Sequence, residues 1–351
     1  MYSEADLQSA VAAGVISHDA AEALRVHAAG MRAAPSADEE HFRLITGFND
    51  IFVTIAAVLL LVAAAGIGNA IAPGVPGLLV AGAAWMLAEF FTRKRRMALP
   101  SIVLLLAFVG GVAAVPIEII DSTRPHFSNS VTAMIGAGIG LISAAAAYVH
   151  WRRFMVPITV AAGTAALALT TIALAVSGLM AVNADTDPEP YLLPLVFLAG
   201  IAVFAVAMRW DMTDPARETR RSDVAFWLHL LAAPMIAHPL FNWLGVSEGE
   251  NIGAASALGV LAVYVLMGMV ALAVDRRALL VSALAYVLIA LTWLFDRFGA
   301  VELNVALTGL VIGSALLALS AFWTPIRSAL VARLPGGMQN RLPRGMALSA
   351  A

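Results

Sequence analysis

The chain has 351 residues, of which 61% are hydrophobic and 13% are charged, and its mean hydropathy is +0.87. Soluble domains are about half apolar and about a quarter charged, so this composition indicates a helical membrane protein. The formal net charge of −2 gives no indication of a nucleic-acid partner. The sequence contains no cysteine, which excludes disulfides, thiolate nucleophiles and cysteine-ligated metals.

The first 30 residues have the pattern of a small cytosolic helical hairpin. Ser3 is placed to cap a first helix, Gly14 to end it, and Ser17 to cap a second helix. A segment of about 30 residues cannot bury a substantial core. We therefore expect this hairpin to need a protein partner or the membrane surface. Residues 31–50 are predicted to form a linker and a juxtamembrane helix.

Apolar runs of about 20 residues fill the chain from residue 51 to residue 323. Such runs are long enough to cross the hydrocarbon core of a bilayer as helices. We therefore predict an all-α polytopic membrane helix bundle of about ten transmembrane helices. The predicted limits are 51–72, 75–91, 99–120, 131–149, 155–182, 192–208, 224–244, 253–274, 278–295 and 303–323.

The basic residues indicate how these spans are oriented. With ten spans, all but two of the 21 lysine and arginine residues fall on one face of the membrane, the exceptions being Arg124 and Arg297. Loops rich in lysine and arginine stay in the cytoplasm, so we expect both termini to be cytoplasmic. The basic cytosolic tail, residues 324–351, begins with a pattern typical of an amphipathic helix on the anionic inner leaflet.

A weak internal repeat accompanies the basic loops. Arginine pairs occur at 95/96, 152/153, 220/221 and 276/277, and each joins one predicted span to the next. In the first two pairs a proline follows the second arginine by four residues, at Pro100 and Pro157. The pattern is compatible with ordinary hairpin turns and also with duplication of a helical hairpin.

The run from Asp223 to Leu244 combines ionisable groups with helix breakers. It holds His229 and His238, which titrate near physiological pH, and Pro234 and Pro239, which each remove a backbone donor. We predict a kink or a helix break at the prolines and a substrate or proton site at the histidines. Nine residues are two and a half turns, so a straight helix would direct the histidines to opposite sides. The alternative is two neutral histidines hydrogen-bonded to neighbouring helices.

Two carboxylates complete the set of candidates. Glu118 lies near the outer end of the third predicted span, and carboxylates at membrane depth are costly and often functional, so it joins the histidines as a candidate substrate or proton site. Glu89, near the inner end of the second span, is spaced to pair with Arg93. We expect no metal site, because no third ligand has helical spacing to the two histidines. We find no catalytic arrangement and expect no cofactor.

Three blocks of the sequence resemble a family of bacterial multi-pass membrane proteins, the domain of unknown function 2157 family. They are AVAAGVISHDAAEALRVHA at 10–28, FRLITGFNDIFVTIA at 42–56 and FWLHLLAAPMIAHPLF at 226–241. The resemblance implies a bacterial inner-membrane protein with an N-terminal helical hairpin followed by many spans. It implies no mechanism and no site residues.

These observations lead to two main functional hypotheses. The first is a secondary transporter for a small solute, since ten spans divide into five plus five as in inverted repeats, although residues 51–182 and 192–323 show no convincing match. The alternative is a non-catalytic membrane scaffold or sensor whose hairpin, residues 1–30, docks a cytosolic protein. A lipid-handling enzyme is disfavoured, because no polar catalytic cluster is present. The expected partners are membrane lipids, with a small solute or a cytosolic protein. A water-accessible cavity at His229 and His238 would favour the transporter, whereas a dry core would favour the scaffold.

Overall fold

The computed structural model describes residues 4–24, 48–123, 126–183, 187–215, 217, 219–245, 254–297, 304–339 and 342. These residues form helices joined by turns, and no β-strand occurs among them. The all-α fold predicted from the sequence is therefore confirmed. The chain divides into two compact units, Met1–Arg43 and Leu44–Ala351.

The first unit contains the predicted helical hairpin. Helix α1 spans Glu4–Ala12, the chain then turns through Gly14 with a φ of 70°, and a second helical stretch covers residues 18–24. The hydroxyl of Ser17 accepts a hydrogen bond of 3.1 Å from the backbone N–H of Ala20, as expected of an N-cap. A left-handed turn residue and a capping serine thus define this hairpin.

The hairpin leaves apolar surface uncovered. Ala21 is fully buried, whereas Val15 is 75% exposed and Leu24 is 44% exposed. So small a unit has too little interior to cover all its apolar side chains. Residues 25–47 lie outside the described part of the chain, and so do the predicted end of the second helix and nearly all of the 31–50 linker.

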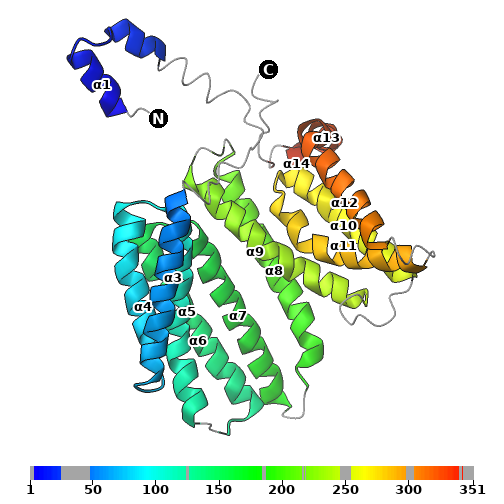
Figure 1. Ribbon diagram of the computed structural model, residues 1–351. Coiled ribbons are helices and arrows are strands. Elements are labelled where there is room, and N and C mark those ends of the chain that lie inside the picture. Colours follow the sequence, from blue (N-terminus) through cyan, green and yellow to red (C-terminus); the bar gives the residue numbers. More distant parts are fainter. Residues whose placement is uncertain are drawn as a thin grey trace. The chain divides into compact units, whose positions relative to one another are not determined.

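The second unit consists of helices that run back and forth between its two ends (Figure 1). Each of the ten predicted apolar runs overlaps one of the helices α3 to α12. The elements are α3 (Phe48–Asn69), α4 (Val75–Ala88), the π-helix η1 (Glu89–Lys94), α5 (Ala98–Thr123), α6 (Asn129–Phe154), α7 (Ile158–Val182), α8 (Glu189–Met212), α9 (Arg220–Trp243), α10 (Ala254–Val274), α11 (Ala278–Arg297), α12 (Asn304–Ala321), α13 (Trp323–Val331) and α14 (Gly336–Gln339).

Among the described residues, eight helices are long and apolar enough to cross a membrane, namely α4 with η1 and each of α3, α5, α6, α7, α8, α9 and α10. Helices α12 and α13 together make a ninth if the 72° bend between them belongs to one span, and α11 is a shorter apolar helix. The protein is therefore a multi-pass membrane protein by the length and composition of its helices. The count of about ten spans stays a prediction.

Consecutive helices pack in pairs, and the turn between the two helices of each pair carries the arginines. The contacts are extensive between α4 and α5, α6 and α7, α8 and α9, and α10 and α11. In the described chain the non-glycine residues with positive φ occur once in each of these four turns. They are Arg96, Met155, Arg217 and Asp275. Such residues are uncommon, so their recurrence supports the interpretation of the arginine pairs as a repeated hairpin.

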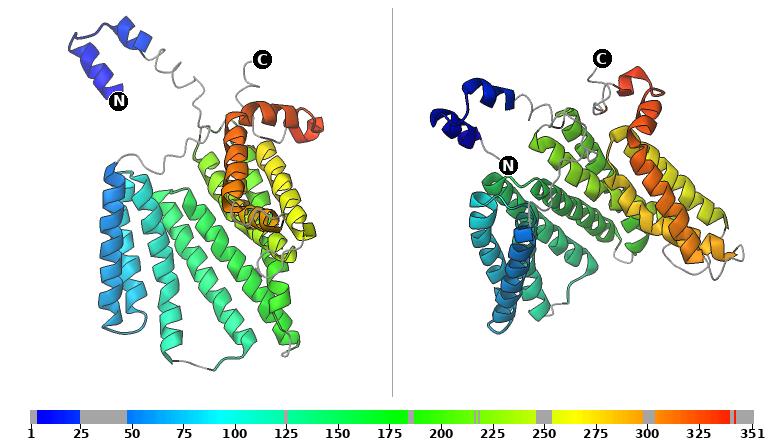
Figure 2. Two further views of the ribbon diagram at one scale, coloured as in Figure 1. Left: turned by 45° about the vertical axis from the view of Figure 1, so that its right-hand side comes forward. Right: turned by 45° about the horizontal axis from the view of Figure 1, so that its top comes forward.

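The arginine-bearing turns lie at one end of the second unit, together with α13 (Figures 1 and 2). We call this end the basic face. Helix α13 begins the predicted basic tail and is helical as expected, whereas residues 340–351, apart from residue 342, lie outside the described part of the chain. The alternation of helix direction thus brings together turns that are far apart in the sequence.

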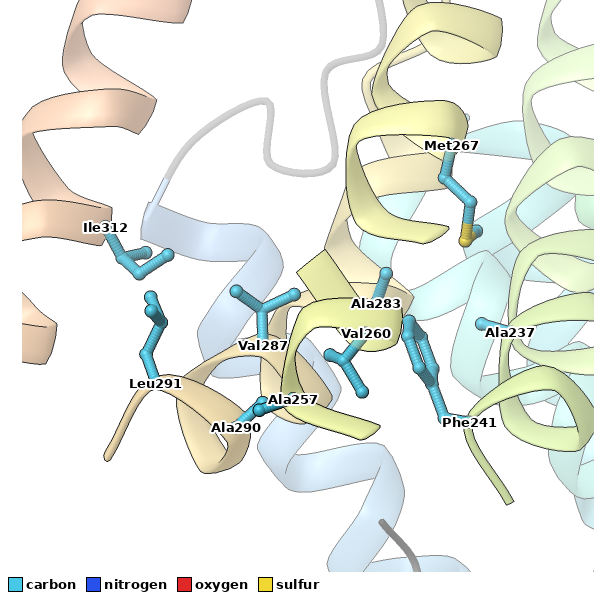
Figure 3. Close-up of a cluster of buried hydrophobic side chains, with 10 residues drawn as sticks. All are labelled: Ala237, Phe241, Ala257, Val260, Met267, Ala283, Val287, Ala290, Leu291 and Ile312. Carbon is cyan, nitrogen blue, oxygen red and sulfur yellow. The ribbon is translucent and has the colours of Figure 1, made fainter. Parts of the chain in front are cut away.

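Helix α9 is the most buried of the eight candidate spans among the described residues. Half of its most apolar stretch, 50%, is buried, against 17% for α3, α5 and α8. It packs on α7, α8 and α11 and supplies buried residues to three hydrophobic clusters. In the cluster of Figure 3, Phe241 of α9 lies beside Val260 of α10 and Ala283 of α11. Helix α9 therefore organises the packing of the helices around it.

Helix α9 continues through Pro234 and Pro239, so the predicted break does not occur, and the predicted kink at these residues stays a prediction. Each proline removes one backbone donor and leaves the other helical hydrogen bonds in place. The residues around them are held by packing, since Ala233, Ala237 and Phe241 are fully buried. Packing of the helix against its neighbours therefore outweighs the local preference of proline, as is common in membrane helices.

Candidate functional site: a buried polar centre at the basic face

The two histidines of α9 lie in different environments. The Nε2 atom of His229 is 2.8 Å from Oδ2 of Asp211 on α8, and the His229 side chain is fully buried. The Nδ1 atom of His238 is 2.6 Å from the hydroxyl of Tyr286 on α11, and His238 is exposed. The structure therefore does not bring the two histidines into one site.

Glu118, the third candidate, binds the start of another helix. Its Oε2 atom accepts hydrogen bonds from the backbone N–H groups of Gly74, at 3.0 Å, and Gly77, at 3.4 Å. These groups belong to the first turn of α4, where unpaired N–H groups and the helix dipole attract an anion. Glu118 thus holds the end of α5 to the start of α4, at the end of the unit opposite the basic face.

Glu89 makes the predicted ion pair and a second one that the sequence did not indicate. Its Oε2 atom is 3.3 Å from Arg93, four residues along η1. Its two oxygens also accept bonds of 2.6 and 3.0 Å from Arg153 on α6. This forked pair, typical of arginine with a carboxylate, joins two of the helical hairpins at the basic face.

A buried polar cluster surrounds Asp211 on the last turn of α8. The guanidinium of Arg276 donates to this carboxylate, with Nη2 2.5 Å from Oδ1 and Nε 3.4 Å from Oδ2. The same Nη2 atom donates to the carbonyl and the hydroxyl of Ser222, each 3.1 Å away. With His229 these residues form what we call the Asp211 cluster, none of whose members is more than 7% exposed.

The charges of the Asp211 cluster are balanced inside the protein. A buried charge is tolerated when it is paired and hydrogen-bonded, and here the carboxylate of Asp211 meets the guanidinium of Arg276. A neutral imidazole that donates from Nε2 to Asp211 keeps a lone pair on Nδ1, and the buried Nδ1 of His229 has no hydrogen-bond partner. The cluster is thus satisfied at each charged group and leaves one nitrogen unpaired.

A second cluster is built on Asp275, the residue before Arg276 in the chain. The carboxylate of Asp275 accepts hydrogen bonds from Nη1 of Arg217, at 2.9 Å, and from Nε1 of Trp323, at 2.6 Å. The Nε atom of Arg327 lies 3.6 Å from the same carboxylate. We call these four residues the Asp275 cluster. They connect the turn between α8 and α9, the turn between α10 and α11, and helix α13.

Arg217 lies in the turn between α8 and α9 and supplies a fixed positive charge. Burial lowers the pKa of its guanidinium and the charge of Arg276 lowers it further, whereas Asp275 and Asp211 raise it. Arginine nevertheless stays protonated in proteins. Its Nη2 atom also donates to the carbonyls of Val274 and Asp275, at 3.1 and 3.0 Å, so the charge is held against the turn.

His150 is a further buried histidine that the sequence did not single out. It lies on α6, fully buried, with Nδ1 3.2 Å from the hydroxyl of Thr159. The rings of Trp85, Phe108 and Phe154 surround it, with centroids 4.6 to 6.2 Å away. Its environment is that of a packed core residue.

The sequence carried only a faint signal for the Asp211 cluster. Asp211 and Arg276 both lie at predicted span ends, where charged residues usually meet water. Asp275 directly precedes the arginine pair 276/277 and is itself the left-handed residue of that turn. Within the described residues, no group of three or more histidine, aspartate or glutamate side chains is placed to hold a metal ion.

A surface groove of about 670 Å³ lies where α12 bends into α13. It is lined by Ala315, Ala318, Leu319, Phe322, Pro325, Ile326, Ala329, Leu330 and Arg333. We call it the elbow groove. Neither histidine of α9 lines the elbow groove, and neither does Glu118, so the groove is separate from the candidate residues predicted from the sequence.

Comparison with protein-family models, with curated proteins and with solved structures finds no match for this chain. The resemblance to the domain of unknown function 2157 family therefore stays a prediction.

Proposed function

We propose that the protein is a non-catalytic membrane scaffold or sensor of the bacterial inner membrane, with the basic face in the cytoplasm. The observation that carries this proposal is the pairing of the ionisable groups at membrane depth. His229 binds Asp211, His238 binds Tyr286, and Glu118 binds the first turn of α4. A dry, internally bonded core is what a scaffold needs, whereas a transporter needs polar groups that a solute can reach.

The hairpin of residues 1–30 supplies the docking element of this proposal. It belongs to a unit separate from the helical bundle, and Val15 and Leu24 are large apolar side chains that it leaves exposed. Exposed apolar side chains on a small helical unit are suited to contact with a protein partner. The partner is a cytosolic protein with a complementary apolar surface.

The test uses the absence of cysteine in the natural chain. Ala225→Cys and Ala232→Cys each place one thiol a turn away from His229, at fully buried positions of α9. Intact membrane vesicles of both orientations are treated with a membrane-impermeant maleimide. We expect no labelling of either thiol from either side, because water does not reach the Asp211 cluster.

Two exposed positions serve as matched controls for labelling and orientation. Thr213→Cys lies in the turn after α8 at the basic face, and Ser122→Cys lies near the end of α5 at the other end. We expect the first to react from the cytoplasmic side and the second from the opposite side. Reaction of Ala225→Cys or Ala232→Cys at a rate near that of these controls would contradict the scaffold.

Docking by the hairpin is tested with a photo-cross-linking residue at His18, which is exposed on the second helix of the hairpin. Val15→Asp and Leu24→Asp should abolish a cross-link to a cytosolic protein in living cells. Ala13→Asp, at an exposed position of the same turn, should leave it unchanged. A cross-link that survives all three substitutions would mean that the apolar side chains do not form the docking surface.

A proton-coupled transporter is the second candidate, and one observation favours it. The Nδ1 atom of His229 is buried without a partner, so it is a free position for a proton inside the membrane domain. In proteoliposomes this candidate requires solute uptake driven by a proton gradient and lost in His229→Gln. It also requires labelling at Ala225→Cys or Ala232→Cys, which separates it from the scaffold.

A further inference from the structure

The elbow groove differs from the buried clusters because it opens outward and is almost entirely apolar. Eight of the nine residues that line it are apolar, and the ninth is Arg333. Its volume of about 670 Å³ falls in the range of about 300–1,000 Å³ that is usual for small-molecule sites. The alanines of its wall, such as Ala318 and Ala329, leave the space that larger side chains would fill.

Helix α13 presents apolar side chains on the side that lines the groove and holds two polar groups against the protein. On its inner side Trp323 donates to Asp275 and Arg327 lies beside the same carboxylate, and both residues are buried. On its outer side Ile326 is 41% exposed, and Phe322 just before the helix is 58% exposed. Thr324 and Ser328 are also exposed, so the apolar surface is confined to the side of α13 that lines the groove. This side of α13 is suited to hydrocarbon.

The position of the groove also indicates lipid. Helix α13 is bent by 72° from α12 and lies at the basic face (Figure 2). If α12 crosses the bilayer, α13 runs along the membrane interface. The groove then extends from the apolar side of α12 at Ala315 to the exposed guanidinium of Arg333 beyond α13. No acidic residue lines it.

We propose that the elbow groove binds one anionic phospholipid, with an acyl chain against Ala318 and Phe322 and the phosphate beside Arg333. The apolar part of the groove matches the acyl chain of the lipid, and the charged end of the groove matches its phosphate. Basic residues at the interface attract anionic lipids, and the Asp275 cluster fixes α13 so that the groove is formed before the lipid arrives. This inference stands independently of the proposed scaffold function.

The test measures lipid retained by the full-length protein. The protein is placed in nanodiscs of equimolar phosphatidylglycerol and phosphatidylcholine, released, and examined by native mass spectrometry. We expect one phosphatidylglycerol to remain bound in preference to phosphatidylcholine. Arg333→Gln should lower this preference about five-fold, the factor expected for one basic residue at an anionic surface. Ala318→Trp, which fills the groove, should remove the bound lipid.

Matched controls separate the groove from general effects of charge and bulk. Arg220→Gln removes an exposed arginine elsewhere at the basic face, and Ala306→Trp adds bulk at an exposed position of α12 remote from the groove. Neither should change retention. Equal retention of the two lipids, or equal loss in Arg220→Gln and Arg333→Gln, would overturn the proposal. Displacement of the lipid by millimolar inorganic phosphate would also overturn it, because a bound acyl chain is not displaced by phosphate.

Two other occupants of the groove give different results. A chain truncated after Gln339 should retain phosphatidylglycerol like the full chain. If retention appears only after truncation, the end of the chain covers the groove and the proposal is wrong. If the full-length protein is a dimer that Ala318→Trp converts into a monomer, the groove is an interface between two copies and the proposal is again wrong.

Discussion

Two of the ion pairs that link helical hairpins have nearly the same N–O distance and very different surroundings. Glu89 and Arg153 lie 2.6 Å apart with side chains 31% and 41% exposed. Asp211 and Arg276 lie 2.5 Å apart with side chains 0% and 3% exposed. The first pair joins the hairpin of α4 and α5 to that of α6 and α7, and the second joins α8 to the turn after α10. Exposure, and not distance, separates the two pairs.

This difference determines what each pair contributes. When an exposed pair is broken, water solvates both partners, so little free energy is lost. When one partner of a buried pair is removed, the other remains as an unpaired charge in a medium that solvates it poorly. Substituting each carboxylate by its amide keeps the shape and removes the charge. Four such substitutions should therefore follow the burial of the group.

The largest effect is expected for Asp211→Asn. The substitution leaves the buried guanidinium of Arg276 without an anion and weakens the bond to His229. We expect the free energy of unfolding to fall by about 3–5 kcal/mol. Titration of the purified protein with dodecyl sulfate in mixed micelles measures it. A loss below about 1 kcal/mol would mean that the cluster behaves like an exposed pair and that water reaches it.

Arg276→Met provides the control for this prediction, because it removes the charge left unpaired in Asp211→Asn. The double variant should be less destabilised than the sum of the two single variants, since the groups act as a pair. Additive losses would show that the two side chains contribute separately, contrary to their contacts.

A smaller effect is expected for Asp275→Asn. Arg217 keeps its hydrogen bonds to the carbonyls of Val274 and Asp275, and its side chain is 13% exposed, so its charge is not left fully unpaired. We expect a loss of about 1–3 kcal/mol. Loss of the bond from Trp323 should also loosen α13, so that trypsin cleaves after Arg333 faster than in the natural protein. Asp121→Asn, at an exposed position of α5, should change neither quantity.

The sequence predicted contacts between residues close together in the chain, but not the long-range contacts of these clusters. The contacts that the sequence predicted are local: Ser17 caps a helix three residues away, and Glu89 pairs with Arg93 four residues away. The spacing of such contacts follows from helix geometry. Asp211 meets His229 at a separation of 18 residues and Arg276 at 65. No helical period connects these positions, because the contacts depend on how α8, α9 and the turn after α10 pack together.

The sequence singled out residues 223–244 for their histidines and prolines, but it did not indicate that α9 would be the most buried of the eight candidate spans. Helix α9 is not broken at its prolines, because the cost of a proline is local, while the packing that holds α9 comes from α7, α8 and α11. The environment of each histidine is likewise set by a neighbouring helix, through Asp211 for His229 and Tyr286 for His238.

Glu118 differs from the carboxylates of the two ion pairs in the kind of partner that it binds. Glu118 is half-buried and its partners are backbone N–H groups and not a charged side chain. In Glu118→Gln an amide oxygen still accepts from Gly74, and only the attraction of the charge to the start of α4 is lost. We expect a loss of about 0.3–1 kcal/mol and faster hydrogen exchange at Gly77. Glu189→Gln, at an exposed position of α8, should leave exchange at Gly77 unchanged.

The smallest effect is expected for Glu89→Gln. The carboxylate has two arginine partners, Arg93 and Arg153, and each of them is more exposed than Glu89 itself. Water and salt replace the lost contacts, so the unfolding midpoint should match that of the natural protein in 0.5 M salt. Arg153→Gln should behave in the same way, and the double variant should show no coupling. If Glu89→Gln instead destabilised the protein as strongly as Asp211→Asn, the basic face would have to exclude water around Arg153, and burial of the single chain would not be the quantity that ranks these pairs.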